Sequence, residues 1–255
     1  RIHAQEFEDP KIIIAGQWFE GEFSRLQTEL ERGNSRTIAF RHATLPDRRL
    51  GIKTGDILAV RDVDVWVNPE NTDMEMDRYF GQTVSAAIRR GGAKKNANGS
   101  IAEDTIGRAL REALGSRAFV APGIVIGTDA GELLLTNNVK RLLHVACVQG
   151  ALGQGFRTSI DVLANCIDRV LGELQFSGRY NSVLIPLIGT GQGGYPVAEV
   201  AQLLVDRAVG FFDSAPDTSI KEIYILAYRN AEELILRDLM SRAQRLKPPD
   251  DLRAG

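Results

Sequence analysis

An apolar strand that runs directly into a cluster of glycines, and then into a helix, constrains this chain more than any other feature. Residues 183–188 carry only apolar side chains, four glycines occur within the six residues 189–194, and Pro196 opens the next helical segment. Glycines let successive backbone N–H groups turn toward one anion, and the helix adds the positive end of its dipole. The segment therefore predicts a phosphate or diphosphate site. A tight strand-to-helix turn is the alternative, but it needs fewer glycines.

Composition sets the scale of the fold and excludes several kinds of site. With 255 residues, 44% of them hydrophobic, the chain can bury one large α/β core. A formal net charge of −2 gives no overall field for gripping a nucleic-acid backbone, so we expect no nucleic-acid partner. The three histidines and two cysteines are dispersed, which predicts no metal site and favours reduced thiols in a cytoplasmic protein.

The ends of the chain give weaker signals. No apolar run reaches the length of a membrane span, so we expect no membrane partner within this segment. The chain begins at Arg1 rather than at a methionine, and we expect further domains before Arg1 in a longer protein. Residues 246–255 are polar and interrupted by proline, which predicts a tail.

Hydrophobic periodicity predicts alternating strands and helices. Strands are predicted at 11–15, 37–41, 63–67, 118–121, 124–126, 142–148, 182–188 and 220–227, with 56–60 preceding a hairpin-like break. Helices are predicted at 19–31, 83–90, 101–114, 158–174, 197–212 and 231–245, with loops at 68–81 and 94–99. The pattern predicts a three-layer α/β/α sandwich with a mixed, mostly parallel central sheet. We divide the chain into an N-terminal strand–helix–strand extension (1–48), a main domain (49–245) and the polar tail (246–255).

Segments far apart in the sequence fall at the carboxyl ends of the predicted strands, where open α/β sheets bind ligands. Residues 55–57 read Gly-Asp-Ile, and residues 64–71 read Asp-Val-Trp-Val-Asn-Pro-Glu-Asn. Residues 84–89 read Val-Ser-Ala-Ala-Ile-Arg, and residues 189–196 read Gly-Thr-Gly-Gln-Gly-Gly-Tyr-Pro. In order and spacing these segments resemble motifs of the macrodomain, the ADP-ribose-binding module: Gly-Asp-Ile, Asp-Ala-Ile-Val-Asn-Ala-Ala-Asn, Val-Asp-x-Ala-Ile-His and Ser-Thr-Gly-x-Tyr-Gly-Tyr-Pro.

The resemblance implies a role for each segment. Asp56 would accept a hydrogen bond from the adenine amine, Tyr228 would stack on the adenine ring, and Asn71 would bind the distal ribose. The glycine-rich segment would wrap the diphosphate through its backbone N–H groups. A capping role for Asp56 and a half-buried rim position for Tyr228 are the alternatives. The implied ligand-binding residues are Asp56, Ile57, Asn68, Asn71, Val84, Gly189, Thr190, Gly191, Gln192, Gly193, Gly194, Tyr195, Tyr228 and Asn230.

Two departures from the family pattern bear on catalysis. Hydrolytic macrodomains have a glycine run before the helix motif and an aspartate within it, whereas here residues 73–81 contain a single glycine and Ser85 replaces the aspartate. A neutral hydroxyl is no substitute for a carboxylate base. Asp73, Glu75 and Asp77 are candidate replacements, although acidic loop residues are mostly solvated. We therefore expect a reader or sensor of ADP-ribose or a related NAD-derived nucleotide, without a cofactor, and with an ADP-ribosylated protein as a further partner.

Two enzymatic alternatives remain open from the sequence. One is an ADP-ribosyl hydrolase, or a phosphatase acting on an ADP-ribose phosphate, in which Asn71 would be catalytic. The other is a Rossmann-type NAD oxidoreductase, because Gly189, Gly191 and Gly194 fit the spacing G-x-G-x-x-G and Asp213 follows downstream. The acidic residue of that fingerprint should end the next strand, but Asp213 ends a predicted helix, which argues against the second alternative.

Overall fold

A computed structural model describes residues 35–151 and 155–249. The predicted strand at 11–15 and the predicted helix at 19–31 lie outside the described residues. The strands of the main sheet are β1 (Thr37–His42), β2 (Arg49–Thr54), β3 (Val65–Asn71), β6 (Val125–Thr128), β7 (Arg141–Ala151), β8 (Gly155–Arg157), β9 (Ser182–Pro186), β10 (Glu222–Ala227) and β11 (Leu246–Lys247). The helices are α2 (Val84–Gly92), α3 (Thr105–Leu114), α4 (Leu133–Asn137), α5 (Ile160–Ser177), α6 (Val197–Ser214) and α7 (Asn230–Arg242). A 3-10 turn, η2 (Ile57–Ala59), and a hairpin of β4 (Lys94–Lys95) with β5 (Ile101–Glu103) complete the described part.

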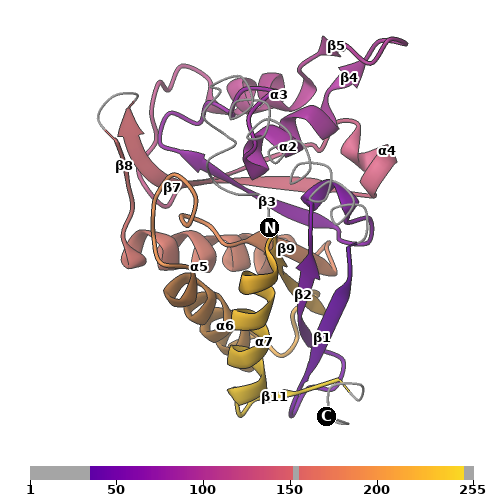
Figure 1. Cartoon of the computed structure of the whole chain (residues 1–255), viewed down its shortest axis with the longest axis vertical. Coiled ribbons are helices and arrows are strands. Elements are labelled where there is room, and N and C mark those ends of the chain that lie inside the picture. The colour runs from indigo at the N-terminus through magenta and orange to yellow at the C-terminus, as the bar shows by residue number, and fades with distance from the viewer. Residues whose placement is uncertain (1–34, 152–154, 250–255) are drawn as a thin grey trace, which may run out of the picture.

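The described strands form a nine-stranded sheet in the order β11-β1-β2-β10-β9-β3-β7-β6, with β8 paired to β7 (Figure 1). Its central strands β2, β10, β9, β3 and β7 run parallel, while β1, β6, β8 and β11 pair antiparallel at its periphery. Helices cover both faces: α5, α6 and α7 lie on one side, and α2, α3 and α4 on the other. The predicted three-layer sandwich with a mixed sheet is confirmed.

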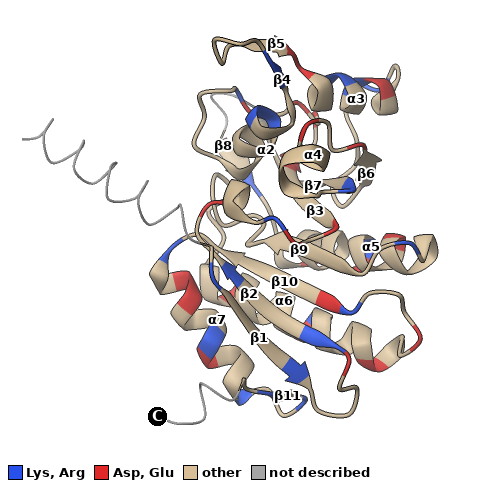
Figure 2. Cartoon of the chain, turned by 90° about the vertical axis from the view of Figure 1, so that its right-hand side faces the viewer, with Lys and Arg blue, Asp and Glu red and all other residues tan. Residues whose placement is uncertain are grey.

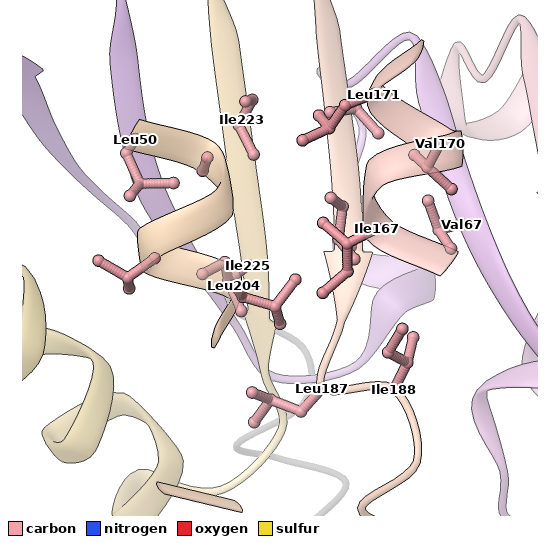
Figure 3. Packing of buried hydrophobic residues seen from close by; sticks show 14 of the residues in the cluster. Leu50, Val67, Ile167, Val170, Leu171, Leu187, Ile188, Leu204, Ile223 and Ile225 are labelled. Atoms are coloured by element: carbon pink, nitrogen blue, oxygen red, sulfur yellow. The ribbon is translucent and has the colours of Figure 1, made fainter. Parts of the chain in front are cut away.

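Successive side chains of each strand point to opposite faces of the sheet, so the core is divided into two clusters. In β3, Val65 and Val67 pack toward α5 and α6, whereas Trp66 packs toward α2 and α3. Figure 3 shows the larger cluster, in which Ile167 and Leu204 contribute from α5 and α6. Because both faces of the central strands are buried, β9 is apolar along its length apart from its first residue, as the continuous apolar run predicts.

Several predicted boundaries are wrong. Residues 56–60 form a 3-10 turn instead of an extended segment, since the Asp56 side chain accepts a hydrogen bond from the Leu58 amide at 2.9 Å. Residues 68–71 continue β3 instead of forming a loop, residues 101–103 form a strand before α3, residues 118–121 form no strand, and α4 was not predicted. Residues 94–95, predicted as part of a loop, form β4, which pairs with β5. The remaining predicted strands and helices within the described residues agree with the structure to within a few residues at each end.

β2 was missed because its sequence, Arg-Leu-Gly-Ile-Lys-Thr, looks too polar for a buried strand. The Lys53 ammonium is nevertheless buried, with 3% of the side chain exposed, and it pairs with Asp62 at 2.6 Å. It also donates to the Thr37 hydroxyl at 2.7 Å and lies 4.6 Å from the centre of the Tyr224 ring. These partners compensate the buried charge.

The described residues of the predicted extension and tail belong to the same sheet as the main domain. β1 pairs with β2 along its length, and β11 pairs with β1.

Figure 2 shows basic and acidic residues interspersed along α7. Within the described ranges, no helix is long and apolar enough to cross a membrane, and no group of acidic, histidine or cysteine side chains is arranged to hold a metal ion.

Candidate functional site

The carboxyl ends of the parallel strands meet along one edge of the sheet. Thr54 at the end of β2 pairs with Ala227 at the end of β10, and Leu226 pairs with Pro186 at the end of β9. The Gly55 amide donates to the Ala227 carbonyl at 2.9 Å, which attaches the turn after β2 to the end of β10. We call this edge, formed by residues 55–57, 67–71, 187–196 and 227–230, the carboxyl edge. It includes the predicted segments at 55–57 and 189–196, the end of the segment at 64–71, and Tyr228 and Asn230, whereas residues 84–89 belong to α2.

The connection from β9 to α6, residues 187–196, is here called the glycine loop (Figure 1). Its internal hydrogen bonds run from the Gly194 amide to the Gly191 carbonyl (3.0 Å) and from the Tyr195 amide to the Gly189 carbonyl (3.1 Å). Among the described residues, no acceptor is within reach of the amides of Gly191, Gln192 and Gly193. Since α6 begins immediately after Pro196, these donors lie near the positive end of an 18-residue helix. The arrangement is suited to binding an anion.

The conformation of the glycine loop requires glycine at some positions but not at Gly191. A Cβ at Gly193 would lie 2.6 Å from the Gly189 carbonyl oxygen, and Gly189 and Gly194 have φ angles of +79° and +64°. A Cβ at Gly191 would meet no atom within 4 Å. Turn formation therefore explains Gly189, Gly193 and Gly194, but it explains neither Gly191 nor the unpaired amides. Thr190 donates its hydroxyl to the Leu187 carbonyl at 2.7 Å and so helps to fix the loop.

The two residues predicted at the adenine lie at neighbouring strand ends. Asp56, partly exposed, uses Oδ1 to cap η2, and no donor among the described residues reaches its Oδ2. Tyr228 is 38% exposed, and its amide donates to Glu232 at 2.8 Å. Burial raises the pKa of the Glu232 carboxyl. Asp56 therefore caps η2 through one carboxylate oxygen, as the alternative interpretation predicted. Its second oxygen is left without a donor among the described residues.

The other predicted residues differ in accessibility. Ile57 is 2% exposed and packs in the core, and Tyr195 packs partly against the larger cluster. Val84, the first residue of α2, is partly exposed, and Asn230, the first residue of α7, is exposed.

Residues 73–83, which we call the strap, stand where the family pattern has a glycine run. Asn71 begins it by accepting a hydrogen bond from the Asp73 amide at 3.1 Å. Arg89 of α2 donates to the Met76 and Asp77 carbonyls at 3.0 and 2.9 Å, and its guanidinium lies 4.6 Å from the centre of the Tyr79 ring. The strap is therefore fixed to α2 at several points.

The large apolar side chains of the strap divide between the core and the surface. Met74, with a φ angle of +55°, and Met76 are buried in the smaller cluster. Tyr79 lies under Arg89 and is half-buried, whereas Phe80 is 81% exposed. The methionines are core residues and do not cover a ligand.

The three candidate catalytic acids differ in how far local hydrogen bonds occupy their carboxylates. Asp77 accepts from the Thr83 hydroxyl at 2.6 Å and from the Arg78 amide at 2.7 Å. Asp73 accepts from the Glu75 amide at 2.8 Å, and Glu75 itself is exposed. Both oxygens of Asp77 are therefore occupied, whereas Asp73 keeps one oxygen, and Glu75 both oxygens, without a donor among the described residues.

A buried polar network beneath Asn71 was not predicted as a site. Asn68 is fully buried, and its Nδ2 donates to Glu70 Oε1 at 2.5 Å and to His144 Nδ1 at 3.0 Å. Ser85 donates its hydroxyl to the same Glu70 oxygen at 2.8 Å. His144 Nε2 lies 2.9 Å from the Thr128 hydroxyl. Asn68, which was predicted to contact the ligand, contacts Glu70 and His144 in the structure. In the sequence, only the two-residue spacing of Asn68 and Glu70, which puts both on one face of a strand, could have indicated this network.

The cysteines lie in the core near this network. Cys147 and Cys166 are both free and fully buried. Burial raises the pKa of Cys147, and it raises that of Cys166 to about 12. Neither thiol is suited to act as a nucleophile.

Comparison with known proteins gives a consistent picture. A family model described as Macro domain matches residues 67–204, more than half of the 255 residues. A protein of Cronobacter sakazakii named O-acetyl-ADP-ribose deacetylase is 27% identical over 194 residues, which cover 76% of this chain and 94% of that protein.

Solved structures agree in fold. A macrodomain of Oceanobacillus iheyensis with ADP has a TM-score of 0.62 at 19% identity, covering 82% of this chain and 96% of the other. A Trypanosoma brucei macrodomain in complex with ADP-ribose has a TM-score of 0.58 at 17% identity, covering 78% of this chain and 73% of the other.

Proposed function

Since the chain belongs to the Macro domain family, we propose that it binds ADP-ribose or a related NAD-derived nucleotide along the carboxyl edge, as a reader or sensor. The diphosphate would accept hydrogen bonds from the amides of residues 191–193 at the start of α6. Adenine would lie between the free oxygen of Asp56 and the ring of Tyr228. The distal ribose would extend toward Asn71.

The observation that carries this proposal is the set of unpaired amides in the glycine loop. Backbone donors that point at no protein acceptor, beside a helix N-terminus, are well placed to bind an anion. The names of the related proteins add the chemical class, because O-acetyl-ADP-ribose, ADP and ADP-ribose share an adenosine diphosphate.

Calorimetry with ADP-ribose, ADP, AMP and ribose 5-phosphate tests the proposal. We expect ADP-ribose and ADP to bind, and AMP and ribose 5-phosphate to bind much more weakly, because neither contains a diphosphate. Gly191→Glu should weaken ADP binding about 100-fold or more, since two like charges about 4 Å apart repel by about 4 kcal/mol near a protein surface. Gly191→Ala is the matched control, because its methyl group enters open space.

The choice of Gly191 matters for the interpretation. Gly193→Glu would also introduce a charge, but its Cβ would clash with the Gly189 carbonyl, so lost binding could come from a distorted loop. A folded Gly191→Glu variant that binds ADP as tightly as the wild type would remove the diphosphate assignment.

The related proteins named deacetylase favour a second candidate function, hydrolysis of an ester of ADP-ribose. We propose binding first, because Ser85 offers a hydroxyl in place of the family's aspartate and both oxygens of Asp77 are engaged. The test is single-turnover release of acetate from O-acetyl-ADP-ribose, and of ADP-ribose from proteins modified on glutamate, aspartate or arginine. We expect little turnover. Robust turnover that disappears in Asn71→Ala would make the hydrolase the better proposal.

A further inference from the structure

Glu70 carries a buried carboxylate that no cation neutralises. Its side chain is 3% exposed, and across the described residues no lysine or arginine forms an ion pair with it. His144 is the nearest candidate, with Nδ1 at 3.9 Å from Oε1. Burying a carboxylate without a cationic partner costs free energy, so hydrogen bonds or dipoles must stabilise it instead.

The hydrogen-bond directions show that His144 does not provide the missing charge. The Thr128 hydroxyl donates to the Asp129 carbonyl at 3.1 Å, so it accepts from His144 Nε2–H. His144 Nδ1 is then free to accept from Asn68 Nδ2. This pattern belongs to neutral histidine. The carboxylate is supported instead by Asn68, by Ser85 and by the N-terminus of α2, where Ser85 is the second residue.

The two oxygens of Glu70 are used differently. Both internal donors end on Oε1, whereas no donor among the described residues reaches Oε2. Oε2 keeps some contact with solvent, in contrast to Asn68 Oδ1, which is sealed from solvent and has no hydrogen-bond partner among the described residues. Glu70, whose side chain as a whole is 3% exposed, therefore keeps one acceptor without a protein donor among the described residues, one residue before Asn71 at the end of β3.

An unpartnered carboxylate oxygen attracts hydroxyl donors and repels phosphate. We propose that Glu70 is a specificity-determining residue of the carboxyl edge: Oε2 accepts a hydrogen bond from a hydroxyl of the distal ribose, and its charge excludes a phosphate there. The edge would then select ADP-ribose with a free terminal ribose over ADP-ribose that carries a terminal phosphomonoester. This inference rests on the proposed function.

Glu70→Gln is an unusually informative variant. The amide oxygen of glutamine can accept from both Asn68 and Ser85, so the internal bonds are kept, while the amide nitrogen replaces Oε2 as a donor. We expect wild-type protein to bind ADP-ribose at least about 10-fold more tightly than its terminal phosphomonoester, the scale of one charged hydrogen bond. In Glu70→Gln this preference should disappear or reverse. ADP, which lacks the distal ribose, should bind both proteins equally.

Controls separate this inference from the proposed function. Ser85→Ala removes one support but keeps the carboxylate, so it should keep the preference. A wild type that binds no ADP would contradict the proposed function, whereas one that binds ADP but does not distinguish the two ribose ligands would overturn only the inference. That wild-type comparison decides the matter even if Glu70→Gln does not fold. Loss of ADP binding in a folded Glu70→Gln would show a structural role and also overturn it.

Discussion

Glycines two positions apart in the glycine loop have different tasks. At Gly193 the space for a side chain is taken by the Gly189 carbonyl, whereas at Gly191 it is empty. The conformation of the loop requires a glycine at position 193 but not at position 191, where we propose that the open space faces the ligand. Their separate roles are invisible in the sequence, where both belong to the same cluster.

This difference predicts opposite effects on stability. Gly193→Ala should lower the free energy of unfolding by about 1–3 kcal/mol, because its methyl group overlaps a backbone oxygen that cannot easily move. Gly191→Ala should be neutral or slightly stabilising, since it reduces the entropy of the unfolded chain by up to about 1 kcal/mol. Urea unfolding of both variants measures this. Equal stabilities would show that the loop conformation described here is wrong.

His42 gives the fold a dependence on pH. Its ring is buried between β1 and α6, and burial lowers the pKa of the imidazole below its ordinary value of 6.5, although Asp213 opposes the shift. Between the folded pKa and 6.5 the unfolded chain binds more protons, so the free energy of unfolding should fall as the pH decreases through this window. His42→Gln should flatten that part of the profile. Urea unfolding at pH 5 to 8 is the measurement, and an unchanged slope would contradict the assignment.

At the scale of elements, long periodic segments are predicted well, and each exception has an identifiable physical cause. β7, β9, α5 and α6 are marked by continuous apolar runs or helical spacing, and their packing agrees with their sequence. β2 was missed because partners distant in sequence bury the Lys53 ammonium. The turn at 56–60 was misassigned because a side-chain cap overrides the β propensity of its apolar residues.

The strap depends on α2 for its shape. Arg89 holds two strap carbonyls and pairs with Asp104 at 2.7 Å, with 19% of its side chain exposed. Arg89→Gln should cost about 1.5–3 kcal/mol of stability, the scale of hydrogen bonds to a charged group, and should speed amide hydrogen exchange across the strap. Arg108→Gln is the control, because its ion pairs are exposed and worth about 0–1 kcal/mol. Unchanged exchange in the strap of Arg89→Gln would show that these contacts do not fix it.

At the scale of the whole molecule, the candidate site exists only because the strand order differs from the chain order. The end of β2 lies beside that of β10, and β10 beside β9, so residues near 56, 190 and 228 become neighbours. Motif order predicted this assembly in outline. It could not separate Asn68, which is buried, from Asn71 at the strand end, nor indicate that Glu70 keeps a free oxygen, because both depend on contacts with α2 and β7.

The predicted division of the chain into an extension, a main domain and a tail is also a question at the scale of the whole molecule. Residues 49–245 stay our proposal for the ligand-binding unit, with β1 and β11 extending its sheet on the side away from β7. A cytoplasmic location and an ADP-ribosylated protein partner stay predictions, which detection of the chain in cell fractions and binding to modified peptides would test.

The central claim is that the amides of residues 191–193 bind the diphosphate of ADP-ribose. Amide NMR of uniformly ¹⁵N-labelled protein, titrated with ADP-ribose and separately with AMP, tests it most directly. We expect ADP-ribose to give large shifts for the Gly191, Gln192 and Gly193 amides, because each gains a charged acceptor. AMP should shift the signals near Asp56 and Tyr228 while leaving the glycine loop much less affected. Saturable ADP-ribose binding that leaves the three amides unshifted would contradict the account.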